Sequence, residues 1–304
     1  MKILTLGSIN IDFNYSVAHI TTPKETQAST GLEMFPGGKG MNHALTLARA
    51  GMEVQLAGMI GEDGVQMLQT IQDGGVDTSL VRVIEGEQTG HAIIQVDEVG
   101  QNAILLYGGA NRRIDEAYVD EVLEQYGEGD ILVSQNEISC LEYILNRAHE
   151  KGMYIVLNPS PCTPELLQMD LSKVSLFFLN EVEGRAMTSY VQPGDILIEL
   201  EALYPDSEFV LTLGAQGAFY KKGASQCYHP SVSVPVVDTT AAGDVFEGYF
   251  LAAYLRGQAP TEALRYATYA AGLAISRPGA AYFSAPTADK VEEFMKNAKN
   301  KCAK

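Results

Sequence analysis

The stretch Asp238-Thr239-Thr240-Ala241-Ala242-Gly243-Asp244 joins two segments of different periodicity. Before it, valines alternate with other residues over 231–237, which predicts a strand. After it, residues 243–256 carry apolar side chains at helical spacing, which predicts a helix. The threonines suit the helix start, and the small residues that follow leave its first N–H groups uncovered. The stretch is therefore predicted to be a strand-to-helix turn whose free N–H groups form an anion site.

Asp244 lies one residue inside this predicted positive pocket. A carboxylate in that place stays ionised and can accept a proton from a hydroxyl group held beside it. An anion site next to a base is what phosphoryl transfer from a polyphosphate to an alcohol requires, because that reaction depends mainly on positioning and charge stabilisation. The alternative is an ordinary helix N-terminus with acidic residues that favour the dipole.

Composition limits the partners that the protein can have. The 304 residues suffice for one large domain or two small ones, and no apolar run approaches the roughly 18 residues of a membrane span. The net charge of −17 disfavours nucleic acid and anionic membranes as partners. The four cysteines have no paired spacing, which argues against disulfides and a zinc site and leads us to expect a cytoplasmic protein. The first residues are predicted to be a buried strand and not a signal peptide.

Strand and helix signals alternate along the chain with short connections. This rhythm predicts an α/β fold with a mainly parallel sheet covered on both faces, and ligands at the carboxyl ends of its strands. No linker divides the chain, so we expect one domain over residues 1–304. The predicted strands cover residues 2–6, 54–58, 130–134, 154–158, 176–180 and 208–214, and the clearest helices cover 41–50, 65–72 and 141–150.

Two segments, about 9–35 and 89–108, read as amphipathic strands without helices. Within the second, residues 91–96 are predicted to pair with 103–107 in a hairpin. A small sheet that projects over the strand ends as a lid would explain both segments, and another subunit could bury its second face. Two ordinary surface hairpins are the alternative.

Two glycine-containing motifs precede the first predicted helix. In residues 7–12, Asn10 and Asp12 point the same way on an extended segment and offer a donor and an acceptor for vicinal hydroxyls, although an Asx turn is also possible. In residues 37–42, three glycines let the backbone approach a ligand, with Lys39 and Asn42 as side-chain donors. The second motif lacks the Walker spacing and is not read as a triphosphate loop.

Two further motifs follow predicted strands. Residues 180–183, Asn-Glu-Val-Glu, would hold magnesium-bound water near a polyphosphate, or they simply form a helix N-terminus. Residues 212–217 contain a Gly-x-x-Gly loop that could lie against nucleotide phosphates, or form a common turn.

Together and in this order, these motifs resemble the ribokinase branch of the PfkB carbohydrate kinase family, from Leu4 to about Pro286. The resemblance implies a three-layer α/β/α sandwich with a mainly parallel central sheet and a small β-sheet lid. It also implies ATP-dependent phosphorylation of a sugar hydroxyl, with Mg²⁺, an activating K⁺ ion and a homodimer formed through the lid.

The resemblance assigns roles residue by residue. Asp244 is the implied catalytic base, and the implied anion hole is formed by Ala241, Ala242 and Gly243. The implied sugar ligands are Asn10, Asp12, Gly38, Lys39, Asn42 and Glu137, covered by the lid residues Ala92, Ile94 and Ile104. The implied nucleotide and magnesium side is Asn180, Glu183, Thr212, Gly214 and Gly217, with Gly243. The implied potassium site is Asp238, Thr240, Ala274, Arg277, Gly279 and Ser284.

Small and branched lid residues cover the sugar in the ribokinase branch, so the resemblance favours a five-carbon sugar, with D-ribose converted to ribose 5-phosphate as the expected reaction. His91, Asn136 and residues 280–284 depart from the ribokinase pattern and bear on the choice of sugar. The alternatives are a related kinase for fructose, deoxyribose, keto-deoxygluconate, a sugar phosphate or a nucleoside. A sugar-phosphate kinase would need more cations than Lys39, and a nucleoside kinase an aromatic clamp. A sugar sensor without catalysis is the alternative outside the enzymes.

Overall fold

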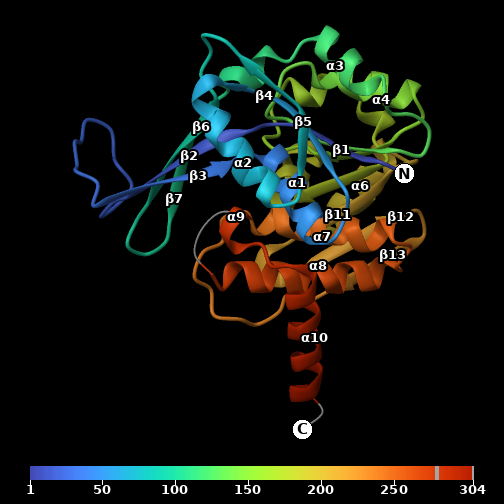
Figure 1. Cartoon of the computed structure of the whole chain (residues 1–304). Helices are drawn as coiled ribbons and strands as arrows, with labels where there is room; N and C mark the ends of the chain where they lie inside the picture. The colour runs from blue at the N-terminus through green and yellow to red at the C-terminus, as the bar shows by residue number, and fades with distance from the viewer. Residues whose placement is uncertain (278–280, 303–304) are drawn as a thin grey trace.

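The computed structural model describes residues 1–277 and 281–302. In this part of the chain, a large sheet of nine strands lies between two layers of helices (Figure 1). The strand order is β13-β12-β11-β10-β9-β8-β1-β4-β5, and only the pairs β11–β12 and β12–β13 are antiparallel. The strands are β1 (Ile3–Leu6), β4 (Gln55–Gly61), β5 (Asp77–Ile84), β8 (Ile131–Gln135), β9 (Tyr154–Asn158), β10 (Leu176–Asn180), β11 (Glu208–Thr212), β12 (Ala218–Lys222) and β13 (Ser225–His229). The predicted mainly parallel α/β sandwich is confirmed.

Helices cover both faces of this sheet. One face carries α1 (Lys39–Arg49), α2 (Val65–Asp73), α7 (Ala242–Leu255), α8 (Pro260–Ile275) and α10 (Ala288–Cys302). The other carries α3 (Glu116–Leu123), α4 (Leu141–Glu150), α5 (Glu181–Thr188) and α6 (Pro193–Leu203). A short helix, α9 (Ala281–Ser284), precedes α10. In the described residues, no helix is both long and apolar enough to cross a bilayer.

A second, four-stranded sheet projects from the sandwich and is called the lid sheet here (Figure 1). Its strands, in the order β3-β2-β6-β7, are β2 (Asn10–Ser16), β3 (Gly31–Gly37), β6 (Gly90–Val96) and β7 (Asn102–Tyr107). The predicted hairpin between residues 91–96 and 103–107 is confirmed by the register of β6 and β7. The central pair β2–β6 is parallel, so two segments far apart in sequence form one sheet.

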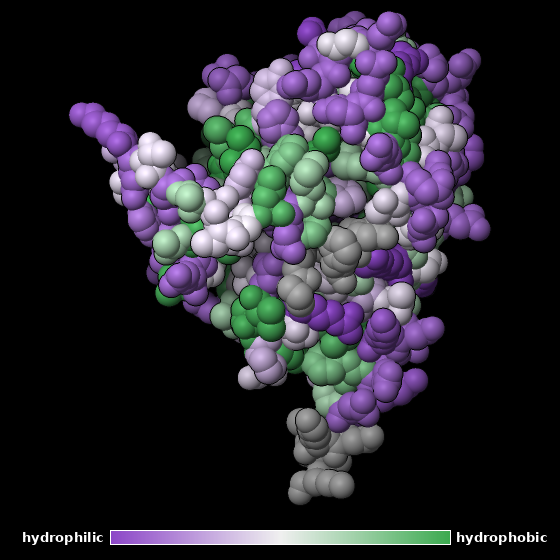
Figure 2. All heavy atoms as spheres, turned by 60° about the vertical axis from the view of Figure 1, so that its left-hand side comes forward, coloured by the Kyte–Doolittle hydropathy of each residue, from purple (hydrophilic) through white to green (hydrophobic). Residues whose placement is uncertain are grey.

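The two faces of the lid sheet differ in their surroundings. On the inner face, Asp12 lies beside Ala92, and Asn14 beside Ile94. On the outer face most side chains are apolar and several of them are exposed, and Figure 2, which brings this side forward, shows green apolar surface among polar side chains. The large apolar residues exposed on the outer face are Leu32, Met34, Ile93, Leu105 and Tyr107.

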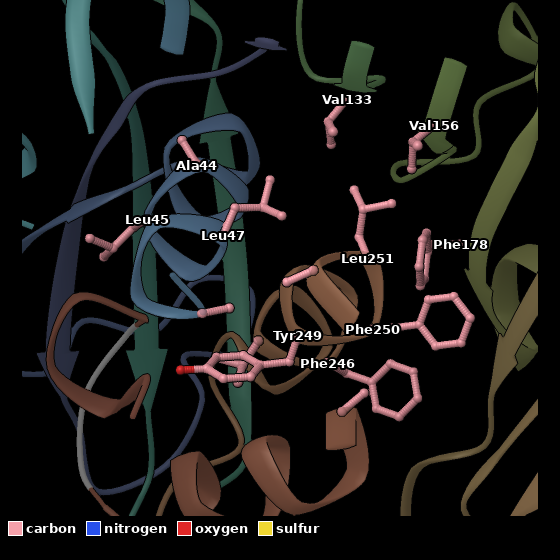
Figure 3. Packing of buried hydrophobic residues seen from close by; sticks show 14 of the residues in the cluster. Ala44, Leu45, Leu47, Val133, Val156, Phe178, Phe246, Tyr249, Phe250 and Leu251 are labelled. Atoms are coloured by element: carbon pink, nitrogen blue, oxygen red, sulfur yellow. The ribbon is translucent and has the colours of Figure 1, made fainter. Parts of the chain in front are cut away.

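The period-two pattern of the central strands divides the core between the two faces of the large sheet. Phe177 and Phe209 point to the face of α6, whereas Val156 and Phe178 point to the face of α7. Figure 3 shows Val133, Val156 and Phe178 directed at Leu251 and Phe250 of α7. Helix α7 is buried from Asp244 to Ala253, so it is the central helix of its layer.

The predicted strand over residues 231–237 is wrong. This segment has no regular secondary structure and pairs with no described strand, and it runs beside α8, where Val232 and Val234 lie against Gly272. The N–H groups of Val237 and Asp238 both donate to Ile275 O at the end of α8, at 2.8 and 3.2 Å. The alternation of valines therefore reflects packing on a helix, and Val236 is 62% exposed.

The start of α7 also differs from the prediction. The N-cap is Ala241, in the left-handed region at φ 58°, and no side chain caps the helix, so the threonines do not play this role. A left-handed residue other than glycine costs about 1–2 kcal/mol, and such strain is typical of functional sites. The predicted helix itself is confirmed as Ala242–Leu255.

Helices α1 and α7 approach closely at Gly248, where an added Cβ would lie 2.2 Å from Thr46 Oγ1. Gly248→Ala is expected to lower the free energy of unfolding by about 1–3 kcal/mol, because overpacking outweighs the better helix propensity of alanine. Gly272→Ala in α8 is the matched control, since its Cβ would meet Val232 at an ordinary 3.5 Å. The free energy of unfolding of the control, measured by urea denaturation, is expected to rise by about 0.5–1 kcal/mol. Equal stability of the two variants would contradict the prediction.

Candidate active site

The predicted sites gather where the lid sheet, the start of α1 and the start of α7 meet. Gly38 is the N-cap of α1 at φ 90°, and a Cβ there would lie 2.8 Å from Ser8 O and 2.9 Å from Asn10 N. Only glycine combines this backbone conformation with such a close approach. The loop of residues 37–42 therefore passes directly over the end of β1 and the start of β2.

Asp244 is buried at the junction of α7 and α1. Its Oδ2 accepts a hydrogen bond from Asn42 Nδ2 at 2.7 Å, and its Oδ1 lies 3.2 Å from His43 Nε2. Lys39 Nζ lies 3.9 Å from the same Oδ1. One turn of α1 thus brings three polar side chains around the proposed base.

These contacts determine the protonation of Asp244. Burial alone would raise its pKa, but Lys39, His43 and Asn42 outweigh burial and lower the pKa to about 2. In return, Asp244 raises the pKa of Lys39 despite burial, with a smaller contribution from Glu137. The site therefore holds an ionised carboxylate and an ammonium group at neutral pH.

Free N–H groups lie at the start of α7. The N–H of Ala242 donates to Thr239 O at 3.2 Å and that of Val245 to Ala241 O at 2.9 Å. Between them, the N–H groups of Gly243 and Asp244 have no acceptor within residues 1–277 and 281–302. Gly243 is exposed, and an added Cβ there would meet no atom within 4 Å. This open, donor-lined space can accommodate an anion such as a phosphoryl group.

The residues expected to bind sugar lie at the base of the lid sheet. Asn10 is held by Asn111, whose Nδ2 donates to Asn10 Oδ1 at 2.7 Å. Burial, with the negative charges of Glu137 and Asp244, raises the pKa of Asp12 to about 7, although Lys39 opposes the shift. Glu137 Oε2 accepts hydrogen bonds from Ser8 Oγ at 2.5 Å and from the Lys39 N–H at 3.3 Å. The site is thus lined with donors and acceptors suited to hydroxyl groups.

The three lid residues assigned to the sugar differ in exposure. Ala92 and Ile94 are buried on the inner face, whereas Ile104 is 56% exposed although it lies opposite Ile94 across β6 and β7. The structure therefore brings Ala92 and Ile94 to the site and leaves Ile104 at its rim.

The residues assigned to the nucleotide lie on neighbouring strands. Asn180 ends β10 and pairs with Thr212 at the end of β11. Asn180 Oδ1 accepts from the N–H groups of Val182 and Glu183, and Glu183 Oε2 accepts from Asn180 N at 2.7 Å, which makes a capping box for α5. The helix-terminus alternative is thus realised, and a magnesium role stays a prediction. Gly214 begins a 3-10 turn and Gly217 follows it, with φ of 52° and 101°.

Most of the residues assigned to potassium meet at the end of α8. Thr240 N–H donates to Asp238 Oδ1 at 2.8 Å, and the Asp238 N–H donates to Ile275 O. Ala274 O accepts from the Arg277 N–H at 3.1 Å, and Ser284 is buried in α9. The C-terminal carbonyl groups of a helix attract cations, and a monovalent-ion site at this place stays a prediction. Gly279 lies outside the described residues.

Sequence reasoning missed four buried polar residues around this site: Asn111, Gln135, His43 and Glu247. His43 follows Asn42, and Glu247 comes three residues after Asp244, so their helical spacing was the available signal. Nothing local to Asn111 or Gln135 predicts their place, because long-range contacts bring them to the site.

Comparisons with known proteins agree with this geometry. A family model described as pfkB family carbohydrate kinase matches residues 1–288. A ribokinase of Haemophilus influenzae is 34% identical over 307 residues, which cover 98% of this chain and 99% of the relative. The crystal structure of a Cryptococcus neoformans ribokinase in complex with ADP has a TM-score of 0.82 and 32% identity, covering 96% of this chain and 99% of that one. An Arabidopsis thaliana ribokinase complexed with ribose and ATP has a TM-score of 0.84 and 26% identity, covering 97% and 98%.

Proposed function

The chain belongs to the pfkB family of carbohydrate kinases, and we propose that it transfers the γ-phosphoryl group of ATP to the primary hydroxyl of D-ribose. The observation that carries this proposal is the buried, ionised Asp244 beside the two free N–H groups at the start of α7. The ribokinase relatives, one of them complexed with ribose and ATP, support the choice of substrates.

The proposed reaction uses each part of the site. The sugar hydroxyl lies against Asp244, which takes its proton as the oxygen attacks the γ-phosphorus atom. The bond between that phosphorus and the bridging oxygen breaks, and ADP leaves with the electron pair. Charge on the transferring group meets the N–H groups of Gly243 and Asp244 and the ammonium group of Lys39.

The pocket favours a small, uncharged sugar. Asn10, Asp12 and Glu137 provide hydrogen-bonding groups, and the lid residues that contact the site are aliphatic. Among the residues assigned to the sugar, Lys39 is the one cation, and it already faces Asp244. A sugar phosphate would need further cations, and a nucleoside would need an aromatic surface for its base.

The cofactors follow from the same assignments. Mg²⁺ would lie with the ATP phosphates and keep several of its waters, oriented from the side of Asn180 and Glu183. K⁺ would be held by Asp238, Thr240 and the carbonyl groups that follow α8, where it would strengthen the anion site at the start of α7. We expect the enzyme to work in the cytoplasm.

The test is ATP consumption with a panel of free sugars, sugar phosphates and nucleosides, with and without K⁺. Turnover on D-ribose that rises with K⁺ is the expected result. Turnover on fructose, deoxyribose or keto-deoxygluconate alone would keep the mechanism and reject ribose. Binding of a sugar with no ATP turnover on any substrate would favour a non-catalytic sugar sensor.

The outer face of the lid sheet is the proposed homodimer interface, because its apolar side chains lack cover within the described chain. Leu105 on β7 is 68% exposed, and Leu105→Glu is expected to give a monomer in light scattering at micromolar concentration, since a charge in an apolar interface is costly. Ile198→Glu on α6, at 63% exposure, is the control and should leave the dimer intact. A monomeric parent protein would refute the interface.

A further inference from the structure

His43 lies on α1 between two carboxylate groups of α7. Its Nε2 is 3.2 Å from Asp244 Oδ1 and 3.3 Å from Glu247 Oε2, and the ring is fully buried. Asp244 and Glu247 are three residues apart and therefore lie on the same face of the helix. The imidazole Nε2 is thus hydrogen-bonded to Asp244 and within ion-pair distance of Glu247, and only Asp244 has a role in the proposed reaction.

Glu247 is an unusual group for a protein core. It is 1% exposed, its Oε2 accepts from Asn158 Nδ2 at 2.9 Å, and its Oε1 has no hydrogen-bond partner in the described part of the chain. A buried carboxylate is costly unless it is neutral or faces a cation. Burial raises the pKa of Glu247, and the strongest opposing influence is His43.

The second ring nitrogen of His43, Nδ1, can also carry a proton. Gln135 Nε2 at the end of β8 lies 2.9 Å from His43 Nδ1, while Gln135 Oε1 is buried without a partner among the described residues. A half-turn of the amide exchanges its two ends and lets Oε1 accept from a protonated Nδ1. A doubly protonated ring would then have an acceptor on each side.

The charged groups around the ring favour this cationic form. Burial alone would lower the pKa of His43, but Glu247 and Asp244 outweigh burial and raise it, with Lys39 opposing. The facing groups are Asp244 and Glu247 from α7, Lys39 from α1, Gln135 from β8 and, beyond Glu247, Asn158 from β9.

We propose that His43 is a protonated positioning residue that, paired with Glu247, orients the Asp244 carboxylate and keeps it ionised for proton transfer. The inference rests on the proposed role of Asp244 as the base. When Asp244 takes the sugar proton and loses its charge, the His43 N–H can turn its hydrogen bond towards Glu247, which keeps the imidazolium paired. The proposed role of Glu247 is therefore to pair with the His43 imidazolium.

The first measurement does not depend on activity. In ¹⁵N-histidine NMR at pH 7.5, the His43 ring of the parent protein is expected to show the shifts of an imidazolium, with His43→Gln identifying its signals among the five histidines. Glu247→Gln keeps the shape of the side chain and removes its charge, so the ring is expected to become largely neutral at the same pH. A neutral His43 ring in the parent protein would overturn the proposal, whether or not a sugar is phosphorylated.

The second measurement separates positioning from folding. His43→Gln keeps a donor towards both carboxylates but removes the charge, so kcat should fall about 10- to 100-fold while the KM values for sugar and ATP change less than about threefold. The acid limb of its pH profile should move to higher pH, because the pKa of Asp244 rises. Adding Glu247→Gln should cost less in the His43→Gln background than alone, because the two act as a unit.

His149 is an exposed histidine on α4, and His149→Gln is the control. Its kcat, KM values and pH profile should match those of the parent. An unchanged kcat and an unmoved acid limb in His43→Gln would refute the proposal. A loss of kcat that parallels a loss of thermal stability, with an unmoved acid limb, would show a merely structural role and refute it as well. If the parent shows no sugar kinase activity at all, the proposed function fails, and the NMR result still decides the charge of His43.

Discussion

Asp244→Asn is expected to lower kcat for sugar phosphorylation by at least about 10³-fold. General-base catalysis contributes a factor of about 10²–10⁴ to the rate. The variant also lacks the charge interaction of Asp244 with Lys39 and His43. The substitution keeps the size of the side chain and its hydrogen-bonding reach towards Asn42. The affinity for sugar and ADP, measured by calorimetry, should therefore change far less than kcat.

The parent enzyme should show no acid limb from Asp244 between about pH 5 and 8. Its pKa of about 2 lies below the ordinary value of 3.8, so the carboxylate is ionised throughout that window. Since the folded pKa is depressed, the stability gained from ionised Asp244 is present above about pH 4 and is lost only as the pH falls towards 2. If Asp244→Asn retained more than a tenth of the parent kcat, Asp244 would not be the base.

Gly243→Leu is expected to lower kcat/KM for ATP by at least about 100-fold. Position 243 is the second residue of α7, it faces open space, and its N–H group is one of the two proposed to meet the transferring phosphoryl group. The Cβ of a leucine would meet no atom within 4 Å, and the rest of its side chain is expected to occupy that space. Loss of a single such donor contact costs about 10²–10³ in rate, and exclusion of the phosphoryl group should cost at least as much.

Gly194→Leu provides a matched control. Gly194 is the second residue of α6, and an added Cβ there also meets no atom within 4 Å. This variant should keep the parent kcat/KM, and both variants should unfold at nearly the parent temperature. Sugar binding to Gly243→Leu, measured without nucleotide, should be unchanged. Full ATP turnover by Gly243→Leu would mean that the phosphoryl group does not lie at the start of α7.

Much of the architecture is encoded locally. The alternation of strand and helix signals predicted the parallel sheet, and the hairpin of residues 91–107 and the helix of residues 242–255 were found as predicted. Hydrophobic periodicity determines these elements, because a strand with period two or a helix with period 3.6 can bury its apolar residues in few ways. The order of the glycine-rich and acidic motifs likewise sufficed to indicate a carbohydrate kinase.

The same local reasoning failed where a long-range partner decides the structure. The valines of residues 231–237 alternate as in a strand, yet the segment pairs with no described strand, and Val232 and Val234 pack on α8 at Gly272. The cap of α7 is a strained Ala241, which no propensity predicts.

The amino-acid sequence by itself determined many of the strands and helices, the family resemblance and the identity of Asp244 as the candidate base. Only the tertiary structure decided the state of that base, because its pKa depends on Lys39 and His43, which come from a helix about 200 positions away in the chain. The pairing of His43 with Glu247 has the same origin. Charge interactions in a buried site depend on distance in space and on the exclusion of water, and the local sequence determines neither of them.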